Sequence, residues 1–198
     1  IFDMGGVIIR SEDQSPRDRL AESLGITHQE LIRQVFGSET ASLATVGRIS
    51  EAEHWQSVAD HFGLDAQGLA DFQKEFWAGD RADRSLLKFI DDLRPQYQTA
   101  LLSNAWGGAR KAVTESYNAL YPFDVIIYSA EVHLAKPDAA IYHLALEKLG
   151  VQPGEAIFVD DFVENIDAAQ AVGIHAVRFF NAGQAMNDVL EIIRQGRA

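Results

Sequence analysis

Residues 156–180 have the sequence AIFVDDFVENIDAAQAVGIHAVRFF, in which two short apolar runs flank a segment of helical period. The first run is Ala156 to Val159, and the second is Ala176 to Phe180. Between them, Val163 to Val172 follows the period of a helix, and Gly173 can close that helix in a left-handed conformation. A strand, a helix and a second strand form a crossover unit, so this stretch predicts a parallel β-sheet.

The same alternation extends from Tyr97 to the end of the chain and includes the first residues. We expect further helices and strands in six segments: helices over Ala109–Leu120, Pro137–Leu149 and Gln184–Arg194, and strands over Thr99–Leu102, Val125–Tyr128 and Ile1–Phe2. Pro137 suits the first turn of a helix, and Gly150 suits a left-handed helix end. Together these segments predict an α/β fold with a doubly wound parallel sheet.

Residues 11–79 lack a convincing strand, and their apolar side chains recur at steps of three and four residues. We therefore expect a helical cap over residues 11–79, inserted into an α/β core of residues 1–10 and 80–198. Ser50 and Glu53 have the spacing of a capping box that opens one of its helices. We expect the cap to lie over the carboxyl ends of the strands, on short hinges near residues 10–16 and 78–83, and to shape substrate choice.

The composition excludes several classes of protein. The chain has 198 residues, with 17 Lys and Arg against 29 Asp and Glu, and its basic residues are scattered singly, so we expect neither a nucleic acid nor a membrane as partner. The absence of cysteine excludes disulfides and thiolate chemistry, and it fits a cytoplasmic location. No apolar stretch approaches the roughly 20 residues of a membrane helix. Ile1-Phe2-Asp3 looks like the last part of a strand, so we expect the natural chain to begin a few residues earlier.

Polar residues follow directly after the predicted strands. In an open parallel sheet the carboxyl ends of the strands form the ligand-binding edge, so these residues are expected to meet. They are Asp3, Ser103 with Asn104, Lys136, and Asp160 with Asp161. The three carboxylates would repel one another, and Mg²⁺, a hard ion that takes oxygen ligands, would offset that repulsion. The sequence therefore predicts a magnesium site beside a candidate nucleophilic carboxylate.

The remaining groups suit a phosphate. Lys136 would neutralise a phosphate together with the nucleophile, and the hydroxyl of Ser103 would donate to it. The turn at Gly5 and Gly6 lets backbone amides approach phosphate oxygens closely. A carboxylate that attacks phosphorus gives an aspartyl-phosphate and divides a difficult displacement into two steps. These residue types therefore predict phosphotransfer chemistry.

Four motifs stand in order at the predicted strand ends: Ile1 to Val7, Leu101 to Asn104, Ala135 to Asp138, and Phe158 to Asp161 with Asn165. These motifs resemble those of the haloacid dehalogenase superfamily, and the helical insertion stands where that family has its small cap. The resemblance implies a Rossmann-like core and a nucleophile at Asp3. It also implies the ligand sets: phosphate on Ser103, Asn104, Lys136 and Gly6, and Mg²⁺ on Asp3, the Gly5 carbonyl and Asp161, with Asp160 as a further residue of the metal site.

One position departs from the family's usual pattern. Most phosphatases of the family carry a second aspartate two residues after the nucleophile, as a general acid and base, and this chain has Gly5 there. Loss of such a group lowers a rate by roughly 10² to 10⁴. In this respect the chain is similar to a branch of the family that has Gly or Asn at this position and that resembles bacterial sugar-1-phosphate phosphatases. True haloacid dehalogenases carry an aromatic residue at the same position.

The resemblance favours a Mg²⁺-dependent phosphatase whose substrate is a small phosphorylated metabolite such as a sugar phosphate. Two alternatives stay open: a metal-independent 2-haloacid dehalogenase, and a catalytically weak member that binds a phosphorylated ligand or a protein partner. The paired Asp160 and Asp161 favour the phosphatase, because a dehalogenase needs no metal. Trp106, just after the second motif, is either a wall of the substrate pocket or a packing residue.

Overall fold

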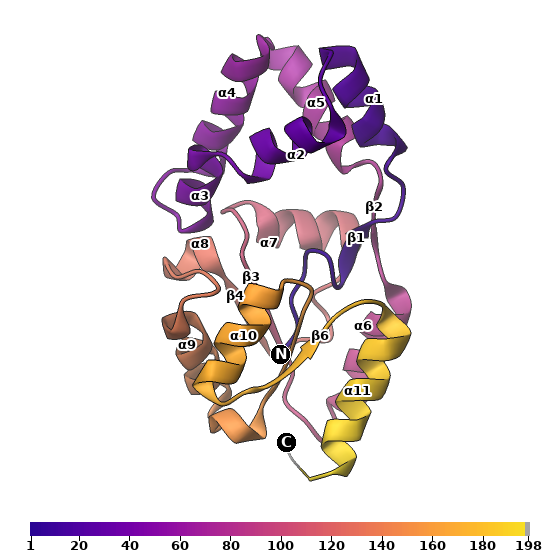
Figure 1. Ribbon diagram of the computed structural model, residues 1–198, viewed down its shortest axis with the longest axis vertical. Coiled ribbons are helices and arrows are strands. Elements are labelled where there is room, and N and C mark those ends of the chain that lie inside the picture. Colours follow the sequence, from indigo (N-terminus) through magenta and orange to yellow (C-terminus); the bar gives the residue numbers. More distant parts are fainter. Residues whose placement is uncertain (197–198) are drawn as a thin grey trace.

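The computed structural model describes residues 1–196, and its longest strands form a parallel sheet in one half of the molecule (Figure 1). Strand β3 (Ala100–Ser103) pairs with β4 (Val125–Tyr128), and β5 (Ile157–Asp160) pairs with β6 (His175–Arg178). Phe2 joins the two pairs, because it forms parallel bridges to a residue of β3 on one side and of β5 on the other. The spatial order is therefore β4, β3, the Phe2 segment, β5 and β6.

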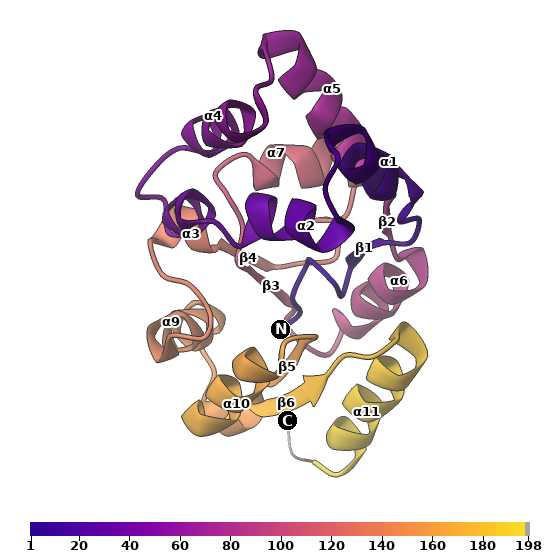
Figure 2. The ribbon, with the colours of Figure 1, turned by 45° about the horizontal axis from the view of Figure 1, so that its top comes forward.

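Helices cover both faces of this sheet (Figure 2). Helices α6 (Arg84–Leu93) and α11 (Ala182–Arg194) pack on one face, and α9 (Ala139–Leu149) and α10 (Val163–Val172) pack on the other. Successive strand residues point to opposite faces, so neighbouring residues of one strand enter different apolar clusters. The shorter elements are α7 (Ala109–Ala112), a π-helical turn (Val113–Tyr117), α8 (Ser129–Val132) and a 3₁₀ turn (Pro153–Glu155). The predicted doubly wound α/β fold is confirmed.

Three predicted helices differ from those observed. The helix predicted over Gln184–Arg194 begins two residues earlier, at Ala182. The predicted helix over Ala109–Leu120 is confirmed only in part, because α7 passes into the π-helical turn, which ends at Tyr117 where Asn118, with a φ of 43°, is left-handed. The helix predicted to begin at Pro137 begins at Ala139 instead. The side chain of Asp138 accepts a hydrogen bond from the amide of Ala140 (2.9 Å) and so fixes that start. The cap at Asp138, and not the proline before it, therefore sets the start of α9.

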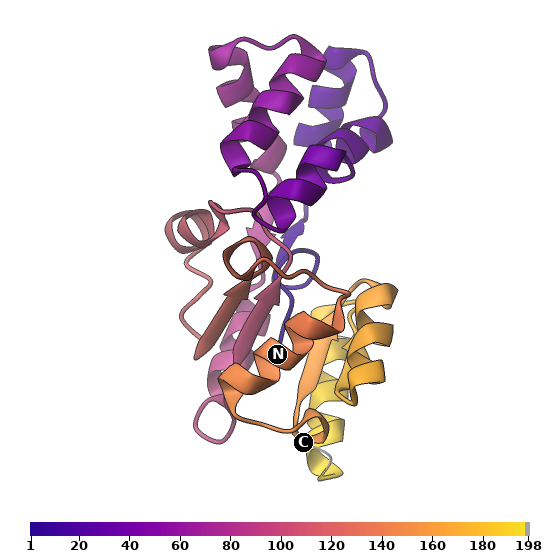
Figure 3. The same cartoon turned by 90° about the vertical axis from the view of Figure 1, so that its left-hand side faces the viewer.

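Residues 15–77 form a helical segment with its own apolar cluster. Its helices are α1 (Ser15–Leu24), α2 (His28–Phe36), α3 (Glu39–Thr45), α4 (Glu51–Phe62) and α5 (Ala66–Trp77). The predicted capping box is confirmed, since the Ser50 hydroxyl accepts from the amide of Glu53 and the Glu53 carboxylate accepts from the amide of Ser50. The segment stands beyond the edge at which the strands of the sheet end (Figure 3).

The two connections to the helical segment form a short antiparallel ribbon in place of the predicted hinges. Strand β1 (Ile9–Ser11) pairs with β2 (Asp80–Ala82). The buried Arg17 donates to Asp80 at 2.9 Å, and Arg10 donates to Asp83 at 2.7 Å, so ion pairs hold both ends of the ribbon. Strands of three residues with charged side chains lack the alternating apolar and polar pattern that indicates a strand, so these two were not predictable from sequence. None of the helices within residues 1–196 has the length and apolar content needed to cross a membrane.

Candidate active site

The strand ends bring the predicted catalytic residues together at one edge of the sheet. Lys136 Nζ lies 2.6 Å from Asp3 Oδ1 and 2.6 Å from Asp160 Oδ2. Asp3, Asp160 and Asp161 each offer a carboxylate oxygen, and these oxygens lie within 4.8 Å of one another. Asp3 ends the central Phe2 segment and Asp160 ends β5, so parallel pairing of neighbouring strands places them side by side.

Asp160 is the most deeply held of the three carboxylates. Its side chain is fully buried, and it accepts hydrogen bonds from the Asn165 side chain (3.0 and 3.1 Å) and from the Phe162 amide (2.9 Å) as well as from Lys136. Asn165 belongs to the first turn of α10, so the start of that helix fixes the carboxylate. Asp160 therefore holds the ammonium group of Lys136 beside Asp3.

Two residues predicted to bind phosphate have other partners here. The side chain of Asn104 donates to the Lys136 carbonyl (2.8 Å) and accepts from the Lys136 amide (2.9 Å). The amide of Gly6 donates to the carbonyl of Ile9 (2.9 Å). One N–H of the Asn104 side chain and the amide of Gly6 are engaged in these bonds, so in this structure Asn104 holds the Lys136 backbone and Gly6 holds its own turn. Ser103 is buried at the end of β3, on the same edge as Asp3.

The two glycines of the turn after Asp3 differ in how much space surrounds them. Gly6 has a φ of 80°, and a side chain there would collide with the carboxylate of Asp161. Gly6 is therefore needed for two reasons: its positive φ favours glycine, and Asp161 leaves no room for a Cβ atom. At Gly5, by contrast, an added Cβ would meet nothing within 4 Å. The Gly5 carbonyl accepts none of the backbone hydrogen bonds found among residues 1–196, so it stays available as a ligand.

The electrostatics of the cluster favour a cation. Three carboxylates and one ammonium leave two negative charges uncompensated, and Oδ1 of Asp161 is buried without a hydrogen-bond partner among the described residues. The pKa of Asp3 is raised to about 6, mainly by burial. The charge of Lys136 opposes this rise, and the charge of Asp160 adds to it. Burial, followed by repulsion from Asp160, also raises the pKa of Asp161. A divalent cation bound at these oxygens would balance the charge and satisfy the unpartnered atom.

Lys136 keeps its proton in this environment. Burial alone would lower its pKa, but the carboxylates of Asp3 and Asp160 outweigh burial and raise the pKa above the ordinary value. A permanent ammonium at this point lies where it would neutralise an anion bound to Asp3.

The core contacts the helical segment through the loop that follows β3. Trp106 stacks on Phe36 of α2, with ring centroids 5.7 Å apart, and lies 4.4 Å from the ring of buried His54. The amide of Gly108 donates to Glu51 at 2.7 Å. Trp106 therefore packs in the apolar cluster of the helical segment, only three residues beyond Ser103. A tryptophan and a first-turn glutamate carry no sequence signal for such a contact, because their partners are distant along the chain.

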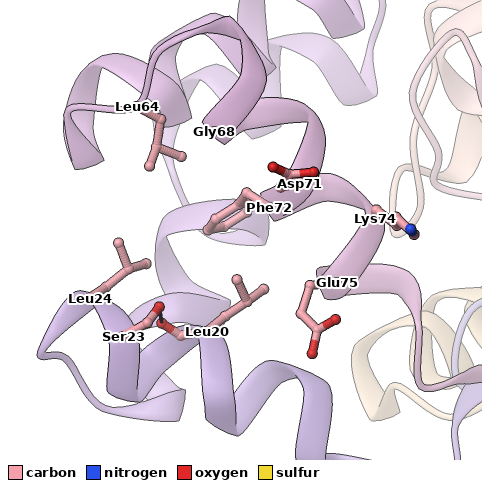
Figure 4. A pocket seen from close by; sticks show the side chains of 9 residues that line it. All are labelled: Leu20, Ser23, Leu24, Leu64, Gly68, Asp71, Phe72, Lys74 and Glu75. Carbon is pink, nitrogen blue, oxygen red and sulfur yellow. Dashed lines mark hydrogen bonds between the residues drawn. The ribbon is translucent and has the colours of Figure 1, made fainter.

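Two cavities lie outside the acidic cluster. One of about 400 Å³ lies between α1 and α5, with an apolar floor that includes Leu24 and Phe72 and a polar rim that includes Lys74 and Glu75 (Figure 4). The other, of about 950 Å³, lies between α4 and the loop at Gly107 and Gly108. Neither is lined by the acidic cluster, whose Asp3, Lys136 and Asp160 are buried. Beside them Asp161 is half-buried and Gly5 is exposed, so these two residues are the parts of the site that reach the surface.

Family comparison agrees with this geometry. A model of the haloacid dehalogenase-like hydrolases matches residues 1–173. The chain belongs to this family. Solved structures related to this haloacid dehalogenase-like hydrolase share its fold. The family enzyme bt-2542 of Bacteroides thetaiotaomicron, in a magnesium complex, matches with a TM-score of 0.78 and 23% identity over 96% of both chains. The L-2-haloacid dehalogenase of Xanthobacter autotrophicus matches with a TM-score of 0.66 and 22% identity over 100% of this chain and 82% of that one.

Curated relatives of the hydrolase differ in how much of their length is matched. The acyl-CoA dehydrogenase family member 10 of Mus musculus is 39% identical over 83 residues, which is 41% of this chain and 8% of that relative. The sesquiterpene phosphatase astK of Aspergillus oryzae is 27% identical over 88% of this chain and 85% of its own length. The phosphorylated carbohydrates phosphatase of Thermotoga maritima is 26% identical over 99% of this chain and 90% of its own length.

Proposed function

We propose that this hydrolase is a Mg²⁺-dependent phosphomonoester phosphatase that acts through an aspartyl-phosphate at Asp3. The observation that carries the proposal is the buried cluster in which one ammonium faces three carboxylates and Asp161 Oδ1 lacks a partner. A dehalogenase that uses no metal would leave those charges unbalanced. Two relatives matched over most of their length are phosphatases by name, and they support phosphomonoester hydrolysis rather than halide release.

The proposed reaction has two steps. Lys136 holds Oδ1 of Asp3, which leaves Oδ2 to attack phosphorus while the bond from phosphorus to the leaving oxygen breaks. The leaving alkoxide takes its proton from water, because Gly5 supplies none. Water then attacks the phosphorus of the aspartyl-phosphate, which releases inorganic phosphate and regenerates the Asp3 carboxylate.

The other residues bind and orient. We assign Asp3, Asp161 and the Gly5 carbonyl as the groups that would hold Mg²⁺, with Asp160 in support, and the bound ion would supply positive charge to the transferring phosphoryl group. Ser103 and Lys136 bind the phosphate. Asn104 and Gly6, predicted as phosphate ligands, are assigned as positioning residues because their polar groups hold Lys136 and the nucleophile turn.

We further propose that residues 11–79 act as a cap on a core of residues 1–10 and 80–198. Asp3, Lys136 and Asp160 are buried at the edge of the sheet beyond which the helical segment stands. A small phosphorylated metabolite would enter when the cap opens, and cap closure would then exclude bulk water from the phosphoryl group.

The test is phosphate release from a panel of phosphomonoesters, with Mg²⁺ and with a chelator, using Asp3→Asn as the blank. The proposal predicts release that needs both Mg²⁺ and Asp3. Halide release from 2-haloacids in chelator, without phosphate release from any ester, would instead identify a dehalogenase. Tight binding of phosphorylated ligands with no turnover would point to a binding protein.

A further inference from the structure

Large apolar side chains are exposed at one edge of this protein. Among residues 1–196 the exposed large hydrophobic residues are Phe36 (45% exposed), Tyr121 (46%), Phe162 (61%), Val163 (41%) and Phe180 (68%). Single exposed apolar residues scattered over a surface need no explanation, but a group at one place indicates a binding surface. Four of these five lie at or over the edge of the sheet that holds the acidic cluster, whereas Tyr121 precedes β4 and lies towards the opposite edge.

Three of the four follow the ends of β5 and β6, close along the chain to Asp160 and to its sheet partner Arg178. The amide of Phe162 donates to Oδ1 of Asp160 (2.9 Å), and Val163 begins α10. Phe180 follows the end of β6, where Arg178 is paired with Asp160 in the sheet. These side chains therefore stand at the carboxyl ends of β5 and β6, directly beyond the candidate metal ligands.

Phe36 reaches the same edge from the cap. It ends α2, and its ring stacks on Trp106, three residues beyond Ser103, while nearly half of the side chain stays exposed. Its ring also meets Trp77 edge to face, with centroids 5.9 Å apart. The aromatic neighbours hold the Phe36 ring, so its exposed part is an ordered apolar surface beside the loop that follows β3.

This apolar rim (Phe36, Phe162, Val163 and Phe180) suits one kind of leaving group. A sugar ring needs hydrogen-bond donors and acceptors around it, and these four side chains offer none. An apolar group would instead remove exposed hydrocarbon on both the substrate and the protein from water.

We propose that the substrate is a phosphomonoester of a hydrophobic alcohol, whose apolar part rests on this rim while its phosphate meets Asp3. The inference rests on the proposed phosphatase function and names its substrate class. It replaces the sugar phosphate that the sequence suggested.

The test is a series of straight-chain alkyl phosphates, from ethyl through butyl and hexyl to octyl phosphate, assayed with Mg²⁺ and beside glucose-6-phosphate. The leaving alcohols have nearly the same acidity, so their length alone changes apolar contact. We expect kcat/KM to rise about two- to fourfold per methylene, the upper value corresponding to about 0.8 kcal/mol. We also expect octyl phosphate to exceed glucose-6-phosphate. A flat series, or a preference for glucose-6-phosphate, would overturn the inference.

Serine substitutions locate the effect on the rim. Phe36→Ser, Phe162→Ser and Phe180→Ser are each expected to lower the ratio of kcat/KM for octyl phosphate to that for ethyl phosphate by at least threefold. Tyr121→Ser is the matched control, since Tyr121 is as exposed as Phe36 but lies away from the rim, and its ratio should equal that of the wild type. Wild-type ratios in all three phenylalanine variants would place the selectivity elsewhere and refute the assignment.

A binding measurement separates this inference from the proposed function. Asp3→Asn protein with Mg²⁺ is titrated with octyl phosphate and with ethyl phosphate by calorimetry. Tighter binding of octyl phosphate by tenfold or more supports the apolar rim, even if the wild-type protein releases no phosphate and the phosphatase proposal fails. Equal affinity for the two esters would overturn the rim inference, whatever the phosphatase assay shows.

Discussion

Replacing Lys136 by methionine would remove the ammonium that lies between two buried carboxylates. Lys136 Nζ is 2.6 Å from both Asp3 and Asp160, and its side chain is 1% exposed. Methionine keeps much of the volume but leaves both carboxylates without their cation. Breaking a buried pair from one side typically costs about 3–5 kcal/mol of unfolding free energy, because the remaining charge stays buried. For a domain of this length, that loss corresponds to a fall of about 6–20 °C in Tm.

The assay is urea unfolding of the metal-free protein at neutral pH, followed by circular dichroism. Lys88→Met is the control, since Lys88 also pairs with an aspartate, Asp92 at 2.8 Å, but is 73% exposed and should change stability little. Adding Asp160→Asn to Lys136→Met should recover part of the lost stability, because one uncompensated charge is then removed. If Lys136→Met matches Lys88→Met in stability, the electrostatic account of the cluster is refuted.

Three further predictions concern the metal, the missing acid and a buried histidine. Mg²⁺ at about 100 times its Kd should stabilise the folded wild type by about 2.7 kcal/mol, which corresponds to a rise of about 5–11 °C in Tm by scanning calorimetry. The same rise in Asp161→Asn would contradict the assigned ligands. Gly5→Asp should fold, because a Cβ at this position meets nothing within 4 Å. The variant should raise kcat more for an alkyl phosphate than for p-nitrophenyl phosphate, because the p-nitrophenolate leaving group needs no proton. Equal effects on the two esters would count against a missing general acid. Burial lowers the pKa of His54 below its ordinary 6.5. As the pH drops below 6.5, this histidine therefore binds a proton in the unfolded chain before it does so in the folded protein, and the free energy of unfolding falls. Urea unfolding at pH 7.5 and at about pH 5.5 should show a smaller fall for His54→Gln than for the wild type, and identical falls would exclude this origin.

The parts of the fold that follow from local patterns were predictable. Val163–Val172 has both the period of a helix and a glycine at its end, and α10 has those same bounds. Asp3, Ser103 and Asp160 were placed together because parallel strands present their carboxyl ends at one edge, a rule that needs only strand positions. The cluster could be foreseen because the rule links residues more than 100 positions apart without any knowledge of their packing.

Features that depend on tertiary contact were not predictable in the same way. The engagement of Asn104 with the Lys136 backbone depends on how two loops approach, and the amide group alone suits a phosphate equally well. Trp106 could not be assigned between pocket and packing, because its ring contacts lie on α2 and α4, more than 50 residues away. The π-helical turn after Ala112 also escaped prediction, since its residues keep an ordinary helical period until Asn118 turns left-handed.

The most direct test of the account is whether phosphate becomes bonded to Asp3 during turnover. Wild-type protein is mixed with octyl phosphate and Mg²⁺, quenched in acid within the first turnovers, digested and examined by mass spectrometry. The account predicts that the peptide containing Asp3 gains the mass of one phosphoryl group, that fragmentation places the group on Asp3, and that chelator abolishes it. Phosphate release at full rate without any phosphorylated Asp3 peptide, or in the Asp3→Asn protein, would contradict the proposed mechanism.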